Sequence, residues 1–332
     1  MKIYIKYSLT ILTSALFCCK RQDLVSPFSD YINVPISVDW SNAALTDDYA
    51  NSFSVYFFPK YGEEPYIKIA GSVDSTNVQL PAGEYSILIF NDFINDLFGI
   101  KFAYETAYSE FTASAILGED TDGYFADIID SDQEIVTVND RLAAWRQDDF
   151  IVYDNGCGYC NTTETSSTTS ESLLGIQPTP VTAQNTINLR VENLDNAQLI
   201  VGVLKGAATA AYLSTNQRYL STSSEYIYTY TFLSKIYDDE LDSANGVASA
   251  TLTTFGKQPT DDTSYELELK VILNSGELMT FTRDVTSQIN GSEDFDIIIN
   301  LTDSENLITL PESQSIGIGV ESWGDSEDVN LI

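Results

Sequence analysis

Cys157 and Cys160 form a Cys-x-x-Cys motif, whose two thiols are the strongest candidates for chemical reactivity in this sequence. Such a pair can act as a redox dithiol, supply half of a zinc site or close a local disulfide. A redox pair needs a helix N-terminus at its first cysteine, whereas a β-like run precedes Cys157 and a Ser/Thr run follows Cys160. Zinc needs about four ligands, and no His or further Cys completes the set. A disulfide is the interpretation that suits an exported chain, with free thiols as the alternative.

Clustered carboxylates are the second candidate chemistry, because paired acids can hydrolyse glycosidic bonds or bind Ca²⁺. Two clusters stand out, namely Asp127, Asp130, Asp132 and Glu134, and then Asp238, Asp239, Glu240 and Asp242. The chain contains 49 acidic residues, so clusters of this kind arise by chance, and none of them matches an EF-hand loop. We therefore interpret them as solvated surface and predict no catalytic residue, no metal site and no cofactor.

The charge balance excludes several classes of protein. Lys+Arg 16 against Asp+Glu 49 gives 16 − 49 = −33, and the chain has no His. So acidic a chain does not bind nucleic acid, since phosphates must be neutralised by clustered Lys and Arg. Without His there is no Ser-His or Cys-His nucleophile, and we predict that the protein is not an enzyme. A composition that is 43% hydrophobic and 12% aromatic indicates folded domains, and 332 residues suggest two of them.

The N-terminus has the pattern of a secretory signal. Lys2 and Lys6 precede the apolar run 8–17, which is too short to span a hydrocarbon core of about 30 Å. The run ends at Leu16-Phe17-Cys18-Cys19, which resembles a bacterial lipobox. We expect residues 1–18 to be a signal peptide, Cys19 to carry the lipid with Cys18 as the alternative acceptor, and residues 19–29 to form a tether from the outer membrane.

Strand-period alternation recurs along the rest of the chain. It is clear in 34–40, 53–57, 67–69, 78–80, 85–89, 187–191, 226–232, 265–273 and 295–301. Polar residues on the alternate positions indicate one solvated face per strand, as in antiparallel sandwiches. Helical periodicity is confined to two segments, 103–117 and 138–145. The row Tyr226, Tyr228 and Tyr230 faces either the core or solvent, where it could stack sugars; the core is the favoured interpretation.

A domain boundary is visible in the middle of the sequence. Residues 161–172 are a Ser/Thr-rich run without an apolar residue, and Pro178-Thr179-Pro180 follows. Such a run cannot bury enough surface to offset the entropy of ordering it. We therefore predict a mostly β protein of two antiparallel β-sandwich domains, 30–178 and 181–332, with the linker at the end of the first.

Several segments together resemble the fimbrillin-like lipoproteins of Bacteroidetes-type bacteria, which include type V pilus subunits. They are 34–40 (VPISVDW), 53–59 (FSVYFFP), 78–91 (VQLPAGEYSILIFN), 186–204 and 316–323 (IGIGVESW). The resemblance implies two transthyretin-like β-sandwiches in tandem. It also implies donor-strand assembly, in which a protease removes the N-terminal strand after a basic residue and a segment of a neighbouring subunit fills the groove.

The basic residues near the N-terminus depart from that polymerising pattern. After Arg21 no Lys or Arg occurs until Lys60, so cleavage at Arg21 leaves the strand at 34–40 in place. This suits a lipid-anchored pilus anchor or accessory adhesin that contacts other subunits through a sheet edge. The alternative is a glycan-binding surface lipoprotein of a nutrient-uptake system. The first hypothesis expects an open sheet edge or groove, and the second expects aromatic side chains facing solvent on one sheet.

Overall fold

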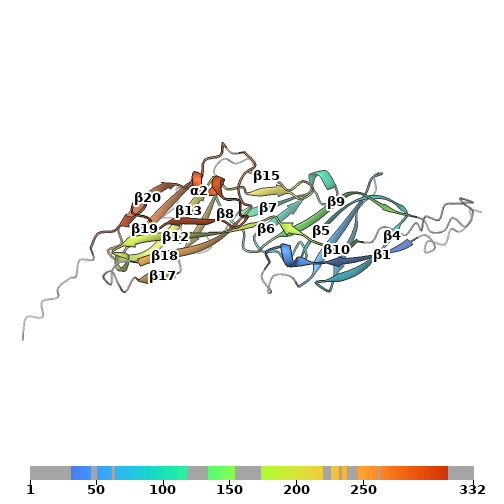
Figure 1. Ribbon diagram of the computed structural model, residues 1–332, viewed down its shortest axis with the longest axis horizontal. Coiled ribbons are helices and arrows are strands. Elements are labelled where there is room, and N and C mark those ends of the chain that lie inside the picture. Colours follow the sequence, from blue (N-terminus) through green and yellow to red (C-terminus); the bar gives the residue numbers. More distant parts are fainter. Residues whose placement is uncertain are drawn as a thin grey trace, which may run out of the picture.

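The computed structural model describes residues 31–45, 51–61, 64–117, 134–153, 173–219, 226–231, 234–237, 246–260 and 262–312. They form an elongated molecule of β-strands, with β1 and β4 toward one end and β19 and β20 toward the other (Figure 1). The one α-helix of this part of the chain is the short α2 (Thr286–Gly291). Short 3-10 turns, η1 (Trp40–Asn42), η2 (Tyr108–Glu110) and η3 (Leu194–Asn196), connect strands.

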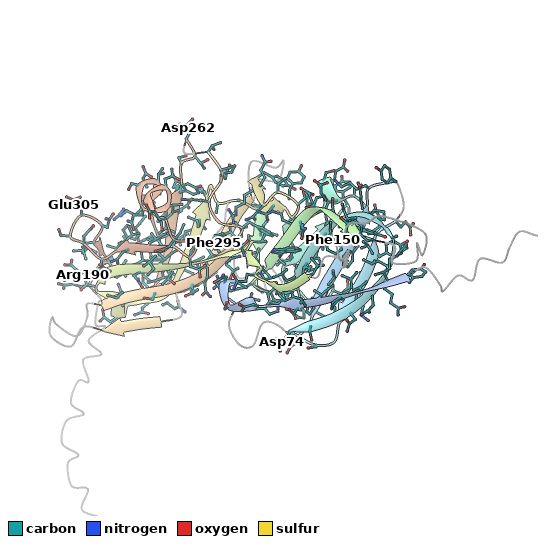
Figure 2. The ribbon with its side chains drawn as sticks, turned by 45° about the vertical axis from the view of Figure 1, so that its right-hand side comes forward. Asp74, Phe150, Arg190, Asp262, Phe295 and Glu305 are labelled. Atoms are coloured by element: carbon teal, nitrogen blue, oxygen red, sulfur yellow. The ribbon has the colours of Figure 1, made fainter. Side chains whose placement is uncertain are left out.

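Two sheets form a sandwich in the N-terminal half. Sheet A has the order β10 (Leu173–Ile176), β1 (Tyr31–Val38) and β4 (Ser75–Pro81). Sheet B has the order β11 (Thr179–Pro180), β9 (Ala143–Val152), β5 (Gly83–Asn91), β2 (Phe53–Pro59) and β3 (Tyr66–Ala70). The alternate apolar residues of the two sheets pack on each other, with Ile36, Phe57 and Ile87 fully buried among them. Phe150 lies inside this lobe (Figure 2).

Sheet B is buried on both faces, because a third layer covers the side that points away from sheet A. Tyr56, Phe58 and Phe90 turn toward this layer, where Phe90 stacks on Phe102 and all three meet Phe111 edge to face. The sequence expectation of one solvated face per strand is therefore wrong for β2 and β5, whose alternate positions are aromatic or aliphatic on both sides.

The third layer is part of a long sheet. Its order is β15 (Gln217–Tyr219), β14 (Ala210–Tyr212), β7 (Thr112–Leu117), β8 (Glu134–Thr137), β16 (Tyr226–Thr231), β13 (Ala197–Lys205), β19 (Glu266–Leu273) and β20 (Leu278–Asp284), with β6 (Ile100–Ala103) beside β7. We call β6, β7, β14 and β15 the junction sheet, since β6, β7 and β15 lie in the middle of the molecule (Figure 1) and β14 pairs with both β7 and β15.

The C-terminal half is a second sandwich. The β16, β13, β19 and β20 part of the long sheet packs on a sheet of order β17 (Ser234–Tyr237), β18 (Gly246–Thr254), β12 (Ala183–Glu192) and β21 (Ile298–Leu301). The short β22 (Ile308–Thr309) also pairs with β12. Leu189, Leu269 and Ile299 are among the buried residues between the two sheets.

Hydrogen bonding crosses the boundary that the sequence suggests. β7 pairs with β14, β8 pairs with β16, and β11 pairs with β9. Pro178-Thr179-Pro180 thus leads into a strand pair, while the Ser/Thr run 161–172 lies outside the described residues. The division into domains 30–178 and 181–332 stays a prediction, and the two lobes share one continuous sheet.

The prediction of a mostly β, sandwich-type fold is confirmed, whereas both predicted helices are wrong. Residues 103–117 comprise the end of β6, the turn η2 and β7, and residues 138–145 form a loop and the start of β9. The alanines of 103–117 favour a helix by their intrinsic propensity. Ala113 is nevertheless completely buried between layers, where pairing with neighbouring strands determines the secondary structure.

Candidate functional site

The N-terminal strand β1 fills the centre of sheet A. It pairs in antiparallel fashion with β4 along its whole length and in parallel with β10. Val34, Ile36 and Val38 point into the sandwich and are buried. Removal of β1 would separate β4 from β10 and uncover the core, so β1 marks the position of a groove that is closed in this chain.

The outer edge of sheet B is β3, and β2 is the one described strand with which it pairs. The amides of Lys60 and Asp92 donate to the carbonyls of Glu84 and Ser52, so the even-numbered residues of β2 bond to β5. Its odd-numbered residues must then bond to β3, through the register partners Tyr66, Lys68 and Ala70.

That register directs the backbone groups of Ile67 and Ile69 away from β2, toward the open side of β3. Their side chains are 51% and 43% exposed, respectively. A strand edge with free backbone groups and exposed aliphatic side chains is a template for adding another strand. β3 is therefore our candidate interface among the described sheet edges.

β20 is a second open edge, at the far end of the long sheet. The amides of Val285 and Leu273 donate to the carbonyls of Tyr265 and Glu277, so the odd-numbered residues of β20 bond to β19. Thr280 and Thr282 therefore direct their backbone groups outward. The polar side chains at these positions make β20 less attractive to an apolar strand than β3.

Where the two lobes meet, Arg141 and Asp296 form a clamp. The guanidinium Nη2 lies 2.7 and 2.8 Å from the two carboxylate oxygens, and the amide of Gln184 donates to Oδ1 at 2.8 Å. The Arg141 side chain is only 6% exposed, against 40% for Asp296. Asn91, completely buried, donates to the Arg141 carbonyl and accepts from the Ala143 amide. This network joins loops of both lobes.

A second arginine, Arg218, packs beside the clamp. Its guanidinium lies 4.8 Å from the centre of the Phe295 ring, and Phe295 sits where the lobes meet (Figure 2). Burial lowers the pKa of Arg218, and the nearby charge of Arg146 lowers it further. Its Nε and Nη2 atoms have no hydrogen-bond partner among the described residues. Neither arginine points to catalysis.

The chemically reactive residues singled out in the sequence lie mostly outside the described part of the chain. This holds for Cys18, Cys19, Cys157 and Cys160, and for the acidic clusters apart from the backbone of Glu134. Lipidation and the state of the Cys-x-x-Cys pair thus stay predictions. Within the described ranges no group of three or more His, Cys, Asp or Glu could hold a metal ion, and no helix is long and apolar enough to cross a membrane.

The tyrosine row of β16 turns toward the core at its described member. Tyr228 is 1% exposed, its hydroxyl donates to the Ala208 carbonyl at 2.7 Å, and it belongs to the second sandwich. Nothing is described of the Tyr226 and Tyr230 side chains. A shallow hollow of about 200 Å³ between β9 and β11 is lined by Trp145, Arg146 and Gln177 among others, and its described lining residues include no carboxylate.

A protein-family model described as "Domain of unknown function (DUF5119)" matches residues 18–228, well over half of the chain. The chain belongs to this family. The family model matches this DUF5119 protein on both sides of the predicted domain boundary at 178–181, and the pairing of β7 with β14 also crosses that boundary. No curated protein matches it.

Solved structures share the fold of this DUF5119 protein. A candidate adhesin from Bacteroides ovatus ATCC 8483 superposes with a TM-score of 0.61 at 18% identity, covering 90% of this chain and 98% of the other. Two less similar structures are another candidate adhesin from Bacteroides ovatus (TM-score 0.49, 10% identity, 82% and 88% covered) and a fimbrial assembly protein from Parabacteroides distasonis ATCC 8503 (TM-score 0.34, 11% identity, 83% and 92% covered). The family of unknown function and the fold shared with the first structure confirm the resemblance to fimbrillin-like proteins.

Proposed function

We propose that this protein is a lipid-anchored, cell-surface, non-enzymatic member of the fimbrillin-like group that serves as a pilus anchor or accessory adhesin. Cys19 would carry the lipid in the outer membrane, and the two lobes would project from it. The observation that carries the proposal is the pairing of β1 on both sides in sheet A, combined with the open edge of β3.

The position of Lys60 supports retention of β1. A cut after Lys60 would remove β2 as well as β1, and β2 pairs with both β5 and β3 and is buried on both faces. Such a loss would destroy sheet B instead of opening a single groove. A subunit that keeps β1 offers no donor-strand groove there and can meet its neighbours through an edge instead.

The edge of β3 is the proposed contact with other pilus subunits. An added strand would form backbone hydrogen bonds with Ile67 and Ile69 and cover their exposed side chains. The negative charge of the chain also favours a partner strand with basic or neutral residues, since like charges across an interface are costly.

Mass spectrometry of the protein from its native envelope tests the anchor. We expect a lipid on Cys19 and an intact 31–38 segment; a chain that lacks both would contradict the anchor and indicate a polymerising subunit.

Cross-linking in the same envelope tests the edge. Ile67→Pro removes an outward amide without breaking a bond to β2, and should reduce cross-linking to fimbrillin-like subunits at least tenfold. Thr280→Pro on β20 is the matched control and should leave it unchanged. Equal cross-linking in both variants, with unfolding curves like that of the parent, would refute the β3 contact.

A further inference from the structure

The junction sheet has one face on the core and one face outward. Phe102, Ala113 and Ala211 mark its inner face, which packs against sheet B. Strand register puts the alternate residues on the outer face, namely Lys101, Ala103, Thr112, Ser114, Ile116, Ala210, Tyr212, Gln217 and Tyr219. We call this set the tyrosine face.

Two tyrosines dominate that face. The rings of Tyr212 and Tyr219, on neighbouring strands, have centroids 4.9 Å apart and planes inclined by 32°. Both are partly exposed, and Thr112 on the same face is buried. Tyr104, the residue that follows β6, is 65% exposed. The rings are thus held in place and still reachable.

Two side chains with hydrogen-bonding groups share this face with the rings. Gln217 is exposed and Ser114 is partly exposed on the same face, and Ile116, 38% exposed, adds an apolar rim. A binding surface of aromatic rings with a few placed amide and hydroxyl groups suits a ligand that is apolar on one side and rich in hydroxyls around its edge. The pyranose ring of a sugar has that character.

The charge of the face narrows the choice of ligand. Lys101 is the one charged residue of the tyrosine face, in a chain with 49 acids and 16 bases. A cationic ligand or a basic peptide would be drawn to other, acidic surfaces of the protein. The net charge of −33 opposes a polyanionic ligand over distances up to about 10 Å, the screening length at 0.1 M salt. A neutral ligand matches the face best.

We propose that the tyrosine face is a binding site for neutral, hexose-based glycans, which stack on Tyr212 and Tyr219 and hydrogen-bond to Gln217 and Ser114. The site lies on the junction sheet and is distinct from β3, so it does not rest on strand addition. It also differs from the tyrosine row of β16, whose described member is buried.

The test uses the purified full-length chain with a panel of neutral oligosaccharides (cellohexaose, laminarihexaose, mannohexaose and lacto-N-tetraose) and with polygalacturonate as the acidic comparison. Isothermal titration and saturation-transfer NMR measure binding at 50 and 500 mM NaCl. We expect at least one neutral oligosaccharide to bind, with an affinity that changes less than twofold between the two salt concentrations.

Ring removal identifies the site. Tyr212→Leu and Tyr219→Leu keep apolar cover over Thr112 but remove the rings, and each should weaken binding at least tenfold. Tyr212→Phe should retain binding, as should Tyr61→Ala, a control at a tyrosine that is 82% exposed after β2. Binding of polygalacturonate alone, no binding by any probe, or unchanged binding in both leucine variants would overturn the proposal. Thermal unfolding of each variant confirms that it is folded.

Discussion

The clamp between Arg141 and Asp296 gives the sharpest prediction about stability. Asp296→Ala removes both acceptors of a guanidinium that is 6% exposed and also leaves the Gln184 amide without its acceptor. Breaking a fully buried ion pair in this way costs about 3–5 kcal/mol, whereas exposed pairs contribute about 0–1 kcal/mol. Because Asp296 is 40% exposed, water can reach the site in the variant and solvate part of the unpaired guanidinium, and we expect a destabilisation of about 2–3 kcal/mol.

Urea unfolding followed by tryptophan fluorescence and by circular dichroism measures this loss. Trp40 and Trp145 both pack against the core of the N-terminal sandwich, so in a Trp323→Phe background fluorescence reports on that lobe, while circular dichroism reports on the whole. The double variant Arg141→Met with Asp296→Ala removes the unpaired buried charge and should be less destabilised than the sum of the single variants, by about 1–2 kcal/mol.

The matched control is Asp149→Asn, which breaks the ion pair of Lys60 with the 78% exposed Asp149 and still suits the positive φ of 59° at that position. It should change the free energy of unfolding by less than about 1 kcal/mol. If Asp296→Ala were no more destabilising than this control, the argument that burial makes the clamp important would be refuted.

Three further predictions follow from local geometry. Gly206→Ala should destabilise the fold far more than Gly276→Ala, although both positions have a positive φ. A Cβ atom at Gly206 would clash with the Ser264 carbonyl oxygen, whereas a Cβ atom at Gly276 would contact no other atom, and equal melting temperatures of the two variants would contradict this. Phe111→Ala should cost about 3–5 kcal/mol in urea unfolding, because Phe111 is completely buried and in contact with the Tyr56 and Phe102 rings; a loss below about 1 kcal/mol would contradict the three-layer packing. Burial opposes the charge of Glu268, but hydrogen bonds from Lys205 and Lys270 outweigh it, so the pKa of Glu268 lies below the ordinary 4.5. The stability that the Glu268 carboxylate adds to the fold is therefore present above pH 4.5 and is lost as pH falls through the lower pKa of the folded state. Glu268→Gln should make the free energy of unfolding less dependent on pH in the acid range, and an unchanged pH dependence would contradict this.

The alternation of apolar and polar residues along the sequence predicts the long strands. The patterns at 34–40, 53–57 and 85–89 correspond to β1, β2 and β5, because each presents an apolar face to the core between sheets A and B. The run of β2 also carries Tyr56 and Phe58 on its other side, a signal of burial on both faces that the alternation of Phe53, Val55 and Phe57 concealed.

The junction sheet and the open edges could not be predicted in the same way. β14 and β15 are three residues each, too short for a periodic signal, and their pairing with β7 depends on contacts between distant parts of the chain. The strand at 67–69 was recognised, but whether a strand lies at an edge or in a sheet's centre is set by its neighbours in space. The partnership of Arg141 with Asp296 has no local signal for the same reason.

The continuity of the long sheet imposes an order on folding. Ala113 in β7 pairs with Phe102 of β6 on one side but with Ala211 of β14 on the other, and Ile135 in β8 pairs with Ile227 of β16. Contacts this distant in sequence are slow to form because a long loop must close first. As the chain emerges from its N-terminus, Phe102 and Phe111 can cover Phe90 and Tyr56 early, but the edge of β7 that pairs with β14 stays open until residues beyond 210 have followed. A nascent chain of this kind needs protection against aggregation until its second half is present.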